Sequence, residues 1–185
     1  TGHGVPGAFM SMIGMMLLNE ACVLKKILDP GKILKDMDNS LIEILQQNDD
    51  FESNKDGMDI SLCLVDIDSN KMYTAGAMRP IYIYRQGAQH IIKGDRFSLG
   101  GTMVKNKIFN TQEYDLMKGD LVYMFSDGYA DQFGGPNRRK MKVSGLSQFL
   151  DQVSQLETSQ QSKEINRFFE NWKGDDNQPE PWFCY

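Results

Sequence analysis

Two acidic residues that follow one apolar run could together bind a metal ion. The segment GDLVYMFSDGYADQ contains an apolar run at residues 121–125, which predicts a strand buried on both faces. Asp127 follows this run, and Asp131 lies four residues further on, so a helical turn after Gly128 would place both carboxylates on one side. Hard divalent cations such as Mg2+ and Mn2+ prefer these oxygen ligands. The alternative is a solvated Asp-Gly turn.

The elements that must position these acids follow an α+β order. A helix is expected over residues 8–28, and its apolar residues wrap around it, which predicts burial on more than one side. Asp29 and Pro30 are typical of a second helix start, as the N-cap and the first helical residue. From residue 58 to 125 the pattern predicts antiparallel strands, one of them over residues 107–116.

The ends of the chain contain the remaining expected elements. Residues 1–7 are rich in glycine and predict a loop, and residues 48–57 predict a polar surface loop. Two helices are expected over residues 144–153 and 159–172, followed by a terminal strand over 182–185. Helices, then strands, then helices is typical of an α+β fold.

Composition is that of one soluble domain covering residues 1–185. The apolar fraction is 41% and the charged fraction is 24%, both ordinary for a globular protein. The net charge of −5 and the lack of a basic face argue against nucleic acid as a partner. Three scattered cysteines match no zinc or disulfide pattern, which favours a reducing cytoplasm. The apolar run at 9–18 is too short to span a bilayer, so no membrane contact is expected.

Four motifs occur in a fixed order: TGHGVPGAFMS, KDGMDISL, GDLVYMFSDGYADQFGG, and WKGD followed by Gln178. Together they resemble the SpoIIE-like branch of the metal-dependent (PPM) serine/threonine protein phosphatases, from Thr1 to about Gln178. The resemblance implies a β-sandwich of mostly antiparallel strands flanked by helices. It also implies removal of phosphate from phosphoserine or phosphothreonine on a partner protein. In that mechanism two Mn2+ or Mg2+ ions activate a water that attacks phosphorus, with no phospho-enzyme.

The same resemblance suggests which residues bind metal. Asp127 lies at the metal-binding Asp of the family, and Asp131 matches an acid that can help hold a third, looser ion. Glu180 falls at the position of another family Asp ligand. Asp56 and Asp59 both lie near a strand start that supplies an acid in some relatives, and the choice between them stays open. No catalytic residue is assigned beyond these ligands.

Departures from the family pattern concern both ends of the chain. Gly2 and Gly4 would shape the loop beside the metals, and His3 is expected to shape that loop rather than act as an acid or base. The first family ligand is an Asp that would lie before Thr1, together with the N-terminal strands of one sheet. We therefore expect an N-terminally truncated domain that is weak or inactive by itself. Pro181 also replaces the second acid of the C-terminal pair.

Some polar residues have two interpretations. Arg79 could bind a substrate phosphate through a bidentate contact, and an exposed salt bridge is the alternative. His90 is expected on the surface of a strand. Arg138 and Arg139 lie in an exposed basic loop, either simply solvated or a docking patch.

Three functions remain open at this level. The first is a phosphatase domain in bacterial signalling, cytoplasmic, with a phosphoprotein substrate such as an anti-anti-sigma-type regulator. An upstream sensor domain is expected in the parent chain, and membrane anchoring upstream is compatible with this. The second is a non-catalytic, phosphatase-like binding module, which the altered ligand set favours. The third is an unrelated metal-binding α+β protein.

Overall fold

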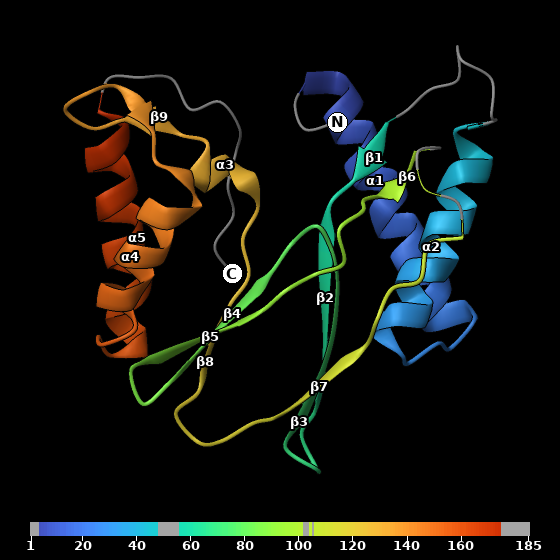
Figure 1. The fold of residues 1–185 in the computed structure, drawn as a ribbon, viewed down its shortest axis with the longest axis horizontal. Helices are drawn as coiled ribbons and strands as arrows, with labels where there is room; N and C mark the ends of the chain where they lie inside the picture. The colour runs from blue at the N-terminus through green and yellow to red at the C-terminus, as the bar shows by residue number, and fades with distance from the viewer. Residues whose placement is uncertain (1–3, 48–55, 102–103, 105, 175–185) are drawn as a thin grey trace. The chain divides into compact units, whose positions relative to one another are not determined.

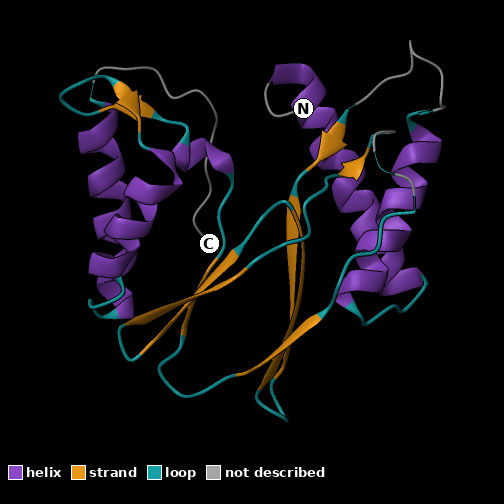
Figure 2. Ribbon diagram, viewed as in Figure 1, coloured by secondary structure: helices purple, strands orange, loops and turns teal. Residues whose placement is uncertain are grey.

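The structure is a computed structural model that describes residues 4–47, 56–101, 104 and 106–174. Helices lead into antiparallel strand pairs and further helices follow, so the expected α+β class is confirmed (Figure 2). The chain divides into two compact units. Unit 1 comprises Thr1–Ile81 and Ile91–Lys118, and unit 2 comprises Tyr82–His90 and Gly119–Tyr185. Each unit has an apolar core of its own.

Unit 1 begins with a long helix, α1 (Gly4–Asn19), which continues directly into a π-helical turn, η1 (Glu20–Leu24). The loop expected over residues 1–7 is therefore wrong from its fourth residue onward. Pro6 lies in the first turn of α1, where backbone N–H groups have no partner inside the helix. The missing N–H of proline consequently removes no helical hydrogen bond at this position.

The second helix, α2 (Pro30–Ile44), starts as its sequence predicts. Asp29 Oδ1 accepts a hydrogen bond from Lys32 N at 2.9 Å, and proline occupies the first helical position. Asp29 Oδ1 also accepts a bond from Thr111 Oγ1 at 2.7 Å. Because Thr111 lies 82 residues further along the chain, this cap also joins the start of α2 to the segment before the last strand of unit 1.

A three-stranded antiparallel sheet lies beside α2. It consists of β2 (Ile60–Asp66), β3 (Lys71–Ala77) and β7 (Gln112–Asp115), with β3 in the middle. The strand expected over residues 107–116 is formed only in β7. Tertiary pairing sets this limit, because the register with β3 runs only from Thr74 opposite Gln112 to Lys71 opposite Asp115.

A shorter ladder joins β1 (Gly57–Met58) to β6 (Leu99–Gly100). Helix α2 contacts β6 as well as β3, and α1 lies beside α2 (Figure 1). The core of unit 1 forms between these helices and strands. Its buried members are Met10, Leu17, Ala21, Ile33, Leu34, Met37, Leu41, Ala75, Ala77, Leu99 and Phe109.

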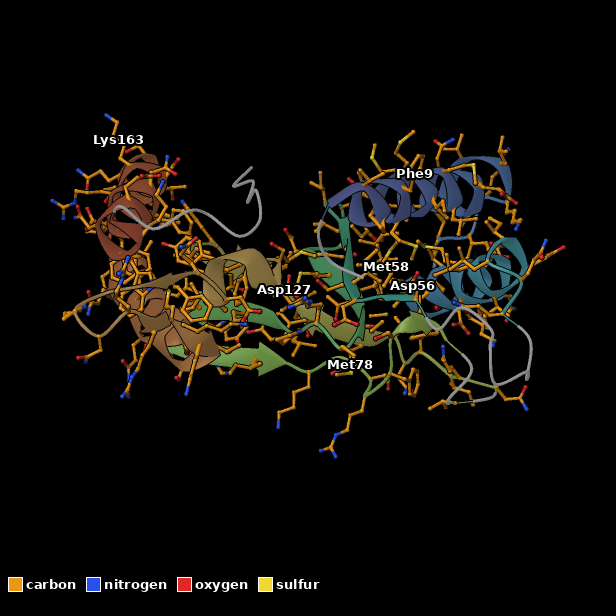
Figure 3. The ribbon with its side chains drawn as sticks, turned by 90° about the horizontal axis from the view of Figure 1, so that it is seen from above. Phe9, Asp56, Met58, Met78, Asp127 and Lys163 are labelled. Carbon is orange, nitrogen blue, oxygen red and sulfur yellow. The ribbon has the colours of Figure 1, made fainter. Side chains whose placement is uncertain are left out.

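The outer face of α1 and η1 is apolar and exposed, so the expected burial on more than one side is wrong within unit 1. Figure 3 labels Phe9 on this helix, where 59% of the residue is exposed. Helical structure over Val5–Leu24 is 20 residues long and apolar enough to cross a membrane by length and composition alone. The apolar helical segment is therefore longer than the run at residues 9–18 predicted. The core helix of a folded domain can have the same length and composition. Other exposed apolar residues here are Val5, Met12, Met15, Met16, Val23 and Leu24.

Unit 2 is built on the strand order β5-β4-β8, formed by β4 (Ile81–Arg85), β5 (Ala88–Ile92) and β8 (Leu121–Tyr123). The apolar run at residues 121–125 is not buried on both faces. Val122 is 38% exposed, because alternate side chains leave β8 on opposite faces and only the face of Leu121 and Tyr123 packs against the core.

After β8 the chain forms a short helix, a hairpin and two longer helices. They are α3 (Asp127–Ala130), β9 (Phe133–Gly134), β10 (Arg139–Lys140), α4 (Lys142–Val153) and α5 (Thr158–Lys173). Both expected C-terminal helices are thus confirmed, and α4 contacts α5. The expected strand at 182–185 lies outside the described residues.

Aromatic side chains dominate the core of unit 2. Phe149 and Phe168 stack with ring centroids 3.8 Å apart, and Tyr129 packs against Phe169 at 5.0 Å. This cluster fixes α3 against α4 and α5, because Tyr129 belongs to α3. The buried members are Tyr82, Tyr84, Tyr129, Ala130, Met141, Leu146, Phe149, Leu150, Val153 and Phe169.

Candidate functional site

Asp127 begins helix α3 in unit 2. The chain leaves β8 at Tyr123, passes through an extended Ser126 and turns into the helix at Asp127, which is labelled in Figure 3. Asp127 is half-buried, whereas the next residue, Gly128, is buried. The backbone thus holds this carboxylate at the first position of a packed turn, which restricts where it can point.

Asp131 follows one helical turn later, as the sequence predicts for a chain that turns after Gly128. Its backbone N–H donates to the carbonyl of Asp127 at 2.7 Å. Its carboxylate is exposed and accepts from Lys140 Nζ at 3.0 Å. The same ammonium lies 5.8 Å from the ring centroid of Phe133. The neighbour of Asp131 in this structure is therefore a lysine, which sequence spacing alone did not indicate.

Trp172 of α5 holds the chain that follows Asp131. Its indole Nε1–H donates to the Gln132 carbonyl at 3.0 Å, and its carbonyl accepts from Gly135 N at 2.8 Å. The space beside Gly134 is filled, because a Cβ there would lie 1.9 Å from the Trp172 carbonyl oxygen. Glycine is thus required sterically at this contact. The only sequence signal for it was the Gly-Gly pair, which also occurs in ordinary turns.

A second polar cluster occurs in unit 1 and contains Arg79. Its guanidinium Nη2 lies 3.9 Å from Asp59 Oδ2, and Ser98 Oγ donates to the same Asp59 carboxylate. Arg79 is half-buried. The salt bridge considered for Arg79 is therefore present, and Asp59 is its acidic partner. Asp56 is engaged differently, since its backbone carbonyl accepts from Gln47 Nε2 at 2.6 Å.

Close backbone packing positions Arg79. A Cβ at Gly76 would lie 2.4 Å from the Arg79 carbonyl oxygen, and one at Gly94 would lie 2.8 Å from it. Met78, just before Arg79, has a φ of 62° and is 50% exposed. A left-handed conformation at a non-glycine residue is strained and persists only where the surroundings enforce it. The two glycines supply that enforcement here, because they let three backbone segments approach closely.

A buried ion pair supports the strand that contains Gly57. Lys107 Nζ donates to Asp38 Oδ1 at 2.9 Å, and Gly100 N donates to the same oxygen at 2.9 Å. Gly100 in β6 is paired with Gly57 in β1. Helix α2 therefore fixes β6, and β6 in turn fixes β1, which lies between Asp56 and Asp59 in the sequence. These contacts join residues far apart in the chain, so no local pattern predicted them.

The remaining site predictions are only partly described. Gly2, His3 and Glu180 lie outside the described residues, and Gly4 is the first residue of α1 rather than part of a loop. His90 is exposed in β5.

The donor set of the described residues does not make a complete divalent-cation site. Among them there is no group of three or more His, Cys, Asp or Glu side chains placed to hold a metal ion. Asp131 is paired with Lys140, and Asp127 begins α3 after the end of β8 at Tyr123. The assignment of metal to Asp127, Asp131 and Glu180 therefore stays a prediction.

Comparison with known proteins identifies similar domains. The family model described as Stage II sporulation protein E (SpoIIE) matches residues 1–178. The SiaA-PP2C domain of Pseudomonas aeruginosa is 24% identical with a TM-score of 0.84, over 98% of this chain and 70% of that one. A structure of the PP2C phosphatase domain and a regulatory-domain fragment of Bacillus subtilis SpoIIE is 16% identical with a TM-score of 0.72. It is matched over 98% of this chain and 50% of that one.

Two further structures are similar at lower identity. The Bacillus subtilis SpoIIE phosphatase domain, presoaked with Mn, is 14% identical with a TM-score of 0.50, over 80% of this chain and 63% of that one. The RsbU and RsbW domains of Rv1364c from Mycobacterium tuberculosis are 14% identical with a TM-score of 0.67, over 98% of this chain and 47% of that one. No curated protein sequence matches the chain. At these identities the structures show a shared PP2C-like fold.

Proposed function

We infer a function on the premise that this chain belongs to the SpoIIE family, whose model matches residues 1–178. It has the fold of PP2C-type phosphatase domains. We propose that it hydrolyses phosphoserine or phosphothreonine on a partner protein. In this reaction a water oxygen forms a bond to phosphorus as the ester P–O bond breaks, releasing inorganic phosphate and the free hydroxyl. The family match is the observation that carries the proposal.

Asp127 is the residue proposed to matter most for this reaction. It is held half-buried at the first position of α3, which follows the edge strand of unit 2 after a short extended segment. We propose two Mn2+ or Mg2+ ions as cofactors, with a third, looser ion as an option, and Asp127, Asp131 and Glu180 as ligands. The Mn-presoaked structure of Bacillus subtilis SpoIIE supports metal use in a relative. Arg79 is proposed as a contact for the substrate phosphate, with Asp59 orienting its guanidinium.

The test is turnover of p-nitrophenyl phosphate and of a phosphoserine peptide in Mn2+, comparing the protein with Asp127→Asn. The exchange keeps the size of the side chain and removes its charge, so we expect a loss of about 100-fold or more in kcat/KM. Glu170→Gln is the matched control, because Glu170 is an exposed acid of α5 in the same unit and its partner is Lys173. Full turnover by Asp127→Asn, or equal losses in both variants, would contradict the role of Asp127.

A phosphatase-like binding module is the second candidate. Two observations favour it: Asp131 is paired with Lys140, and the described residues contain no group of three acids, histidines or cysteines placed to hold a metal ion. This module would bind a phosphoprotein without hydrolysing it. Tight phosphopeptide binding by a protein that releases no phosphate in Mn2+ or Mg2+ would favour this second function.

The cellular setting is proposed by analogy with the family. We propose a cytoplasmic phosphoprotein substrate, such as an anti-anti-sigma-type regulator, and a sensor domain upstream in the parent protein. Nucleic acid is not proposed as a partner, because the chain has a net charge of −5. Phosphoproteomic comparison of cells with and without the protein would identify the substrate, and an unchanged phosphoproteome would contradict the assignment.

A further inference from the structure

The hairpin β9–β10 concentrates positive charge directly after the Asp127–Asp131 turn. Between residues 127 and 142 there are four cations and two acids, so this segment has a net charge of +4 − 2 = +2 in a chain of −5. All four cations are exposed, and they are Arg138, Arg139, Lys140 and Lys142. A local excess of this sign within an acidic protein creates a field that attracts anions.

The backbone that carries these cations is anchored to the core of unit 2. Gly135 N donates to the Trp172 carbonyl at 2.8 Å, and Met141 N donates to the Gln132 carbonyl at 3.1 Å. Both ends of the hairpin are therefore tied down, and Met141 is buried. A segment that is already ordered loses little backbone entropy when a ligand binds, which favours recognition.

The cations differ in how their charge is used. Lys140 is paired with Asp131 at 3.0 Å and lies over the ring of Phe133, so its charge is partly offset at the turn. Arg139 is paired with Gly134 in the ladder and, as a neighbour of Lys140 in the strand, leaves the hairpin on the opposite face.

Two cations stand at strained positions that bound the hairpin. Arg138 and Lys142 have φ angles of 46° and 64°, in the left-handed region. Residues other than glycine rarely adopt this backbone conformation, and where they do it is often at functional sites. Here they set an arginine at the turn and a lysine at the base of the hairpin.

We propose that the β9–β10 hairpin is a docking site for an anionic segment of the phosphoprotein substrate, rich in Asp and Glu and adjacent to the phosphorylated residue. The inference rests on the proposed function. Arg138 and Arg139 present planar guanidinium groups that match carboxylates in a bidentate manner. The hairpin follows Asp131 in the same unit, so a segment bound there brings its phosphorylated residue near the Asp127–Asp131 turn. Contacts of this kind between exposed charges weaken as salt increases.

Fluorescence anisotropy with two labelled phosphoserine peptides tests the inference, one flanked by Asp and Glu and one by Asn and Gln. The protein is expected to bind the acidic peptide about 10-fold more tightly at low salt, since each exposed pair contributes modestly. The triple variant Arg138→Gln, Arg139→Gln, Lys142→Gln should lose this preference and bind the neutral peptide unchanged. Glutamine tolerates the left-handed backbone, as Gln46 and Gln86 show with φ angles of 49° and 50°.

A double variant of the hairpin, Arg138→Gln with Arg139→Gln, has a matched control in α5 of the same unit, Lys163→Gln with Arg167→Gln. Both control residues are exposed and lie more than one helical turn before Trp172, which holds the hairpin, and Figure 3 shows Lys163 pointing away from α5. The hairpin variant should weaken the preference for the acidic peptide, and the control should keep it. Equal losses in the two double variants would indicate a general field effect and overturn the docking site. Arg139→Glu, at a regular strand position, should weaken the preference by itself, independently of any strain at the other two positions.

Other outcomes separate the docking site from the proposed function. A protein that shows no preference between the peptides, or a hairpin variant that keeps the preference, overturns the docking site whether or not phosphate is released. Hairpin-dependent binding to phosphatidylserine vesicles, without peptide preference, would overturn it in favour of a membrane surface. Retained hairpin-dependent preference with no turnover of p-nitrophenyl phosphate would contradict hydrolysis and leave the docking site intact for a binding module.

Discussion

Each unit contains an Asp–Lys pair of nearly the same length in a very different environment. In unit 1, Lys107 and Asp38 are 2.9 Å apart, and their side chains are 3% and 2% exposed. In unit 2, Lys140 and Asp131 are 3.0 Å apart with side chains 44% and 51% exposed. Water cannot replace either partner of the buried pair, so the first pair is committed to the fold: losing one partner would leave a buried charge uncompensated. The second pair can exchange its partner for water, for a substrate or for a cation.

The comparison shows that distance alone does not reveal the role of an ion pair. Lys107 also donates to the backbone carbonyls of Ser98 and Gly100, so its ammonium is saturated by three acceptors inside unit 1. Lys140 instead lies between a carboxylate and an aromatic ring at the surface. The first arrangement fixes strands, whereas the second holds Asp131 in an exposed and exchangeable contact.

The largest expected effect comes from breaking the buried pair. Asp38→Ala should lower the free energy of unfolding by about 3–5 kcal/mol, because it leaves the Lys107 ammonium buried without its counter-charge. Urea denaturation monitored by circular dichroism measures this. Asp38→Leu combined with Lys107→Met should recover only part of the loss, because apolar residues replace both charges while Gly100 N and the carbonyls of Ser98 and Gly100 lose their partners. A loss below about 1 kcal/mol in the single variant would show that the pair is not committed to the fold.

A smaller effect is expected where the hairpin that carries Lys140 meets Trp172. Gly134→Ala should destabilise the protein by about 1–3 kcal/mol, as overpacking typically does. The new Cβ would lie 1.9 Å from the Trp172 carbonyl oxygen, so the backbone must move. Gly145→Ala in α4 is the control, because its Cβ would meet the Met141 side chain at 3.1 Å and no backbone atom outside its own helix. Equal thermal stability of the two variants would contradict the required contact.

The exposed pair itself should contribute little to stability. A double-mutant cycle with Asp131→Asn and Lys140→Gln should give a coupling energy below about 1 kcal/mol, decreasing further in 1 M salt. Chemical denaturation of the four proteins measures it. A coupling energy near that of the buried pair would mean that the turn and hairpin form a committed structure, and the contrast between the two units would disappear.

The smallest effect concerns an acid stabilised without any lysine. Ser69 Oγ donates to Asp66 Oδ2 at 2.6 Å, and this bond, with backbone N–H groups, holds the pKa of Asp66 below its usual 3.8. A lowered folded pKa contributes stability above the unfolded pKa, and this is lost as pH falls through the folded value. Ser69→Ala should therefore raise the Asp66 pKa in an NMR titration. An unchanged pKa would contradict the assigned cause.

Much of the local structure was predictable because its causes are local. The start of α2 agrees with the Asp29–Pro30 cap, and the antiparallel strands found between residues 58 and 125 agree with the alternation in that part of the sequence. A helical turn after Gly128 was one of two alternatives in the sequence, and the structure forms a helix that starts one residue earlier, at Asp127. The burial of α1 and of β8 was not predictable, because exposure depends on what packs against an apolar face.

The sequence by itself determined the family, the order of helices and strands, and the position of Asp127 after an apolar strand. Periodicity, capping residues and motif order are properties of neighbouring residues, so they can be read without coordinates. Only the tertiary structure decided that Asp131 faces Lys140, that Asp59 pairs with Arg79, and that Trp172 closes on Gly134. The physical reason is that contacts between residues far apart in the chain depend on how whole elements pack, and spacing alone does not encode that packing.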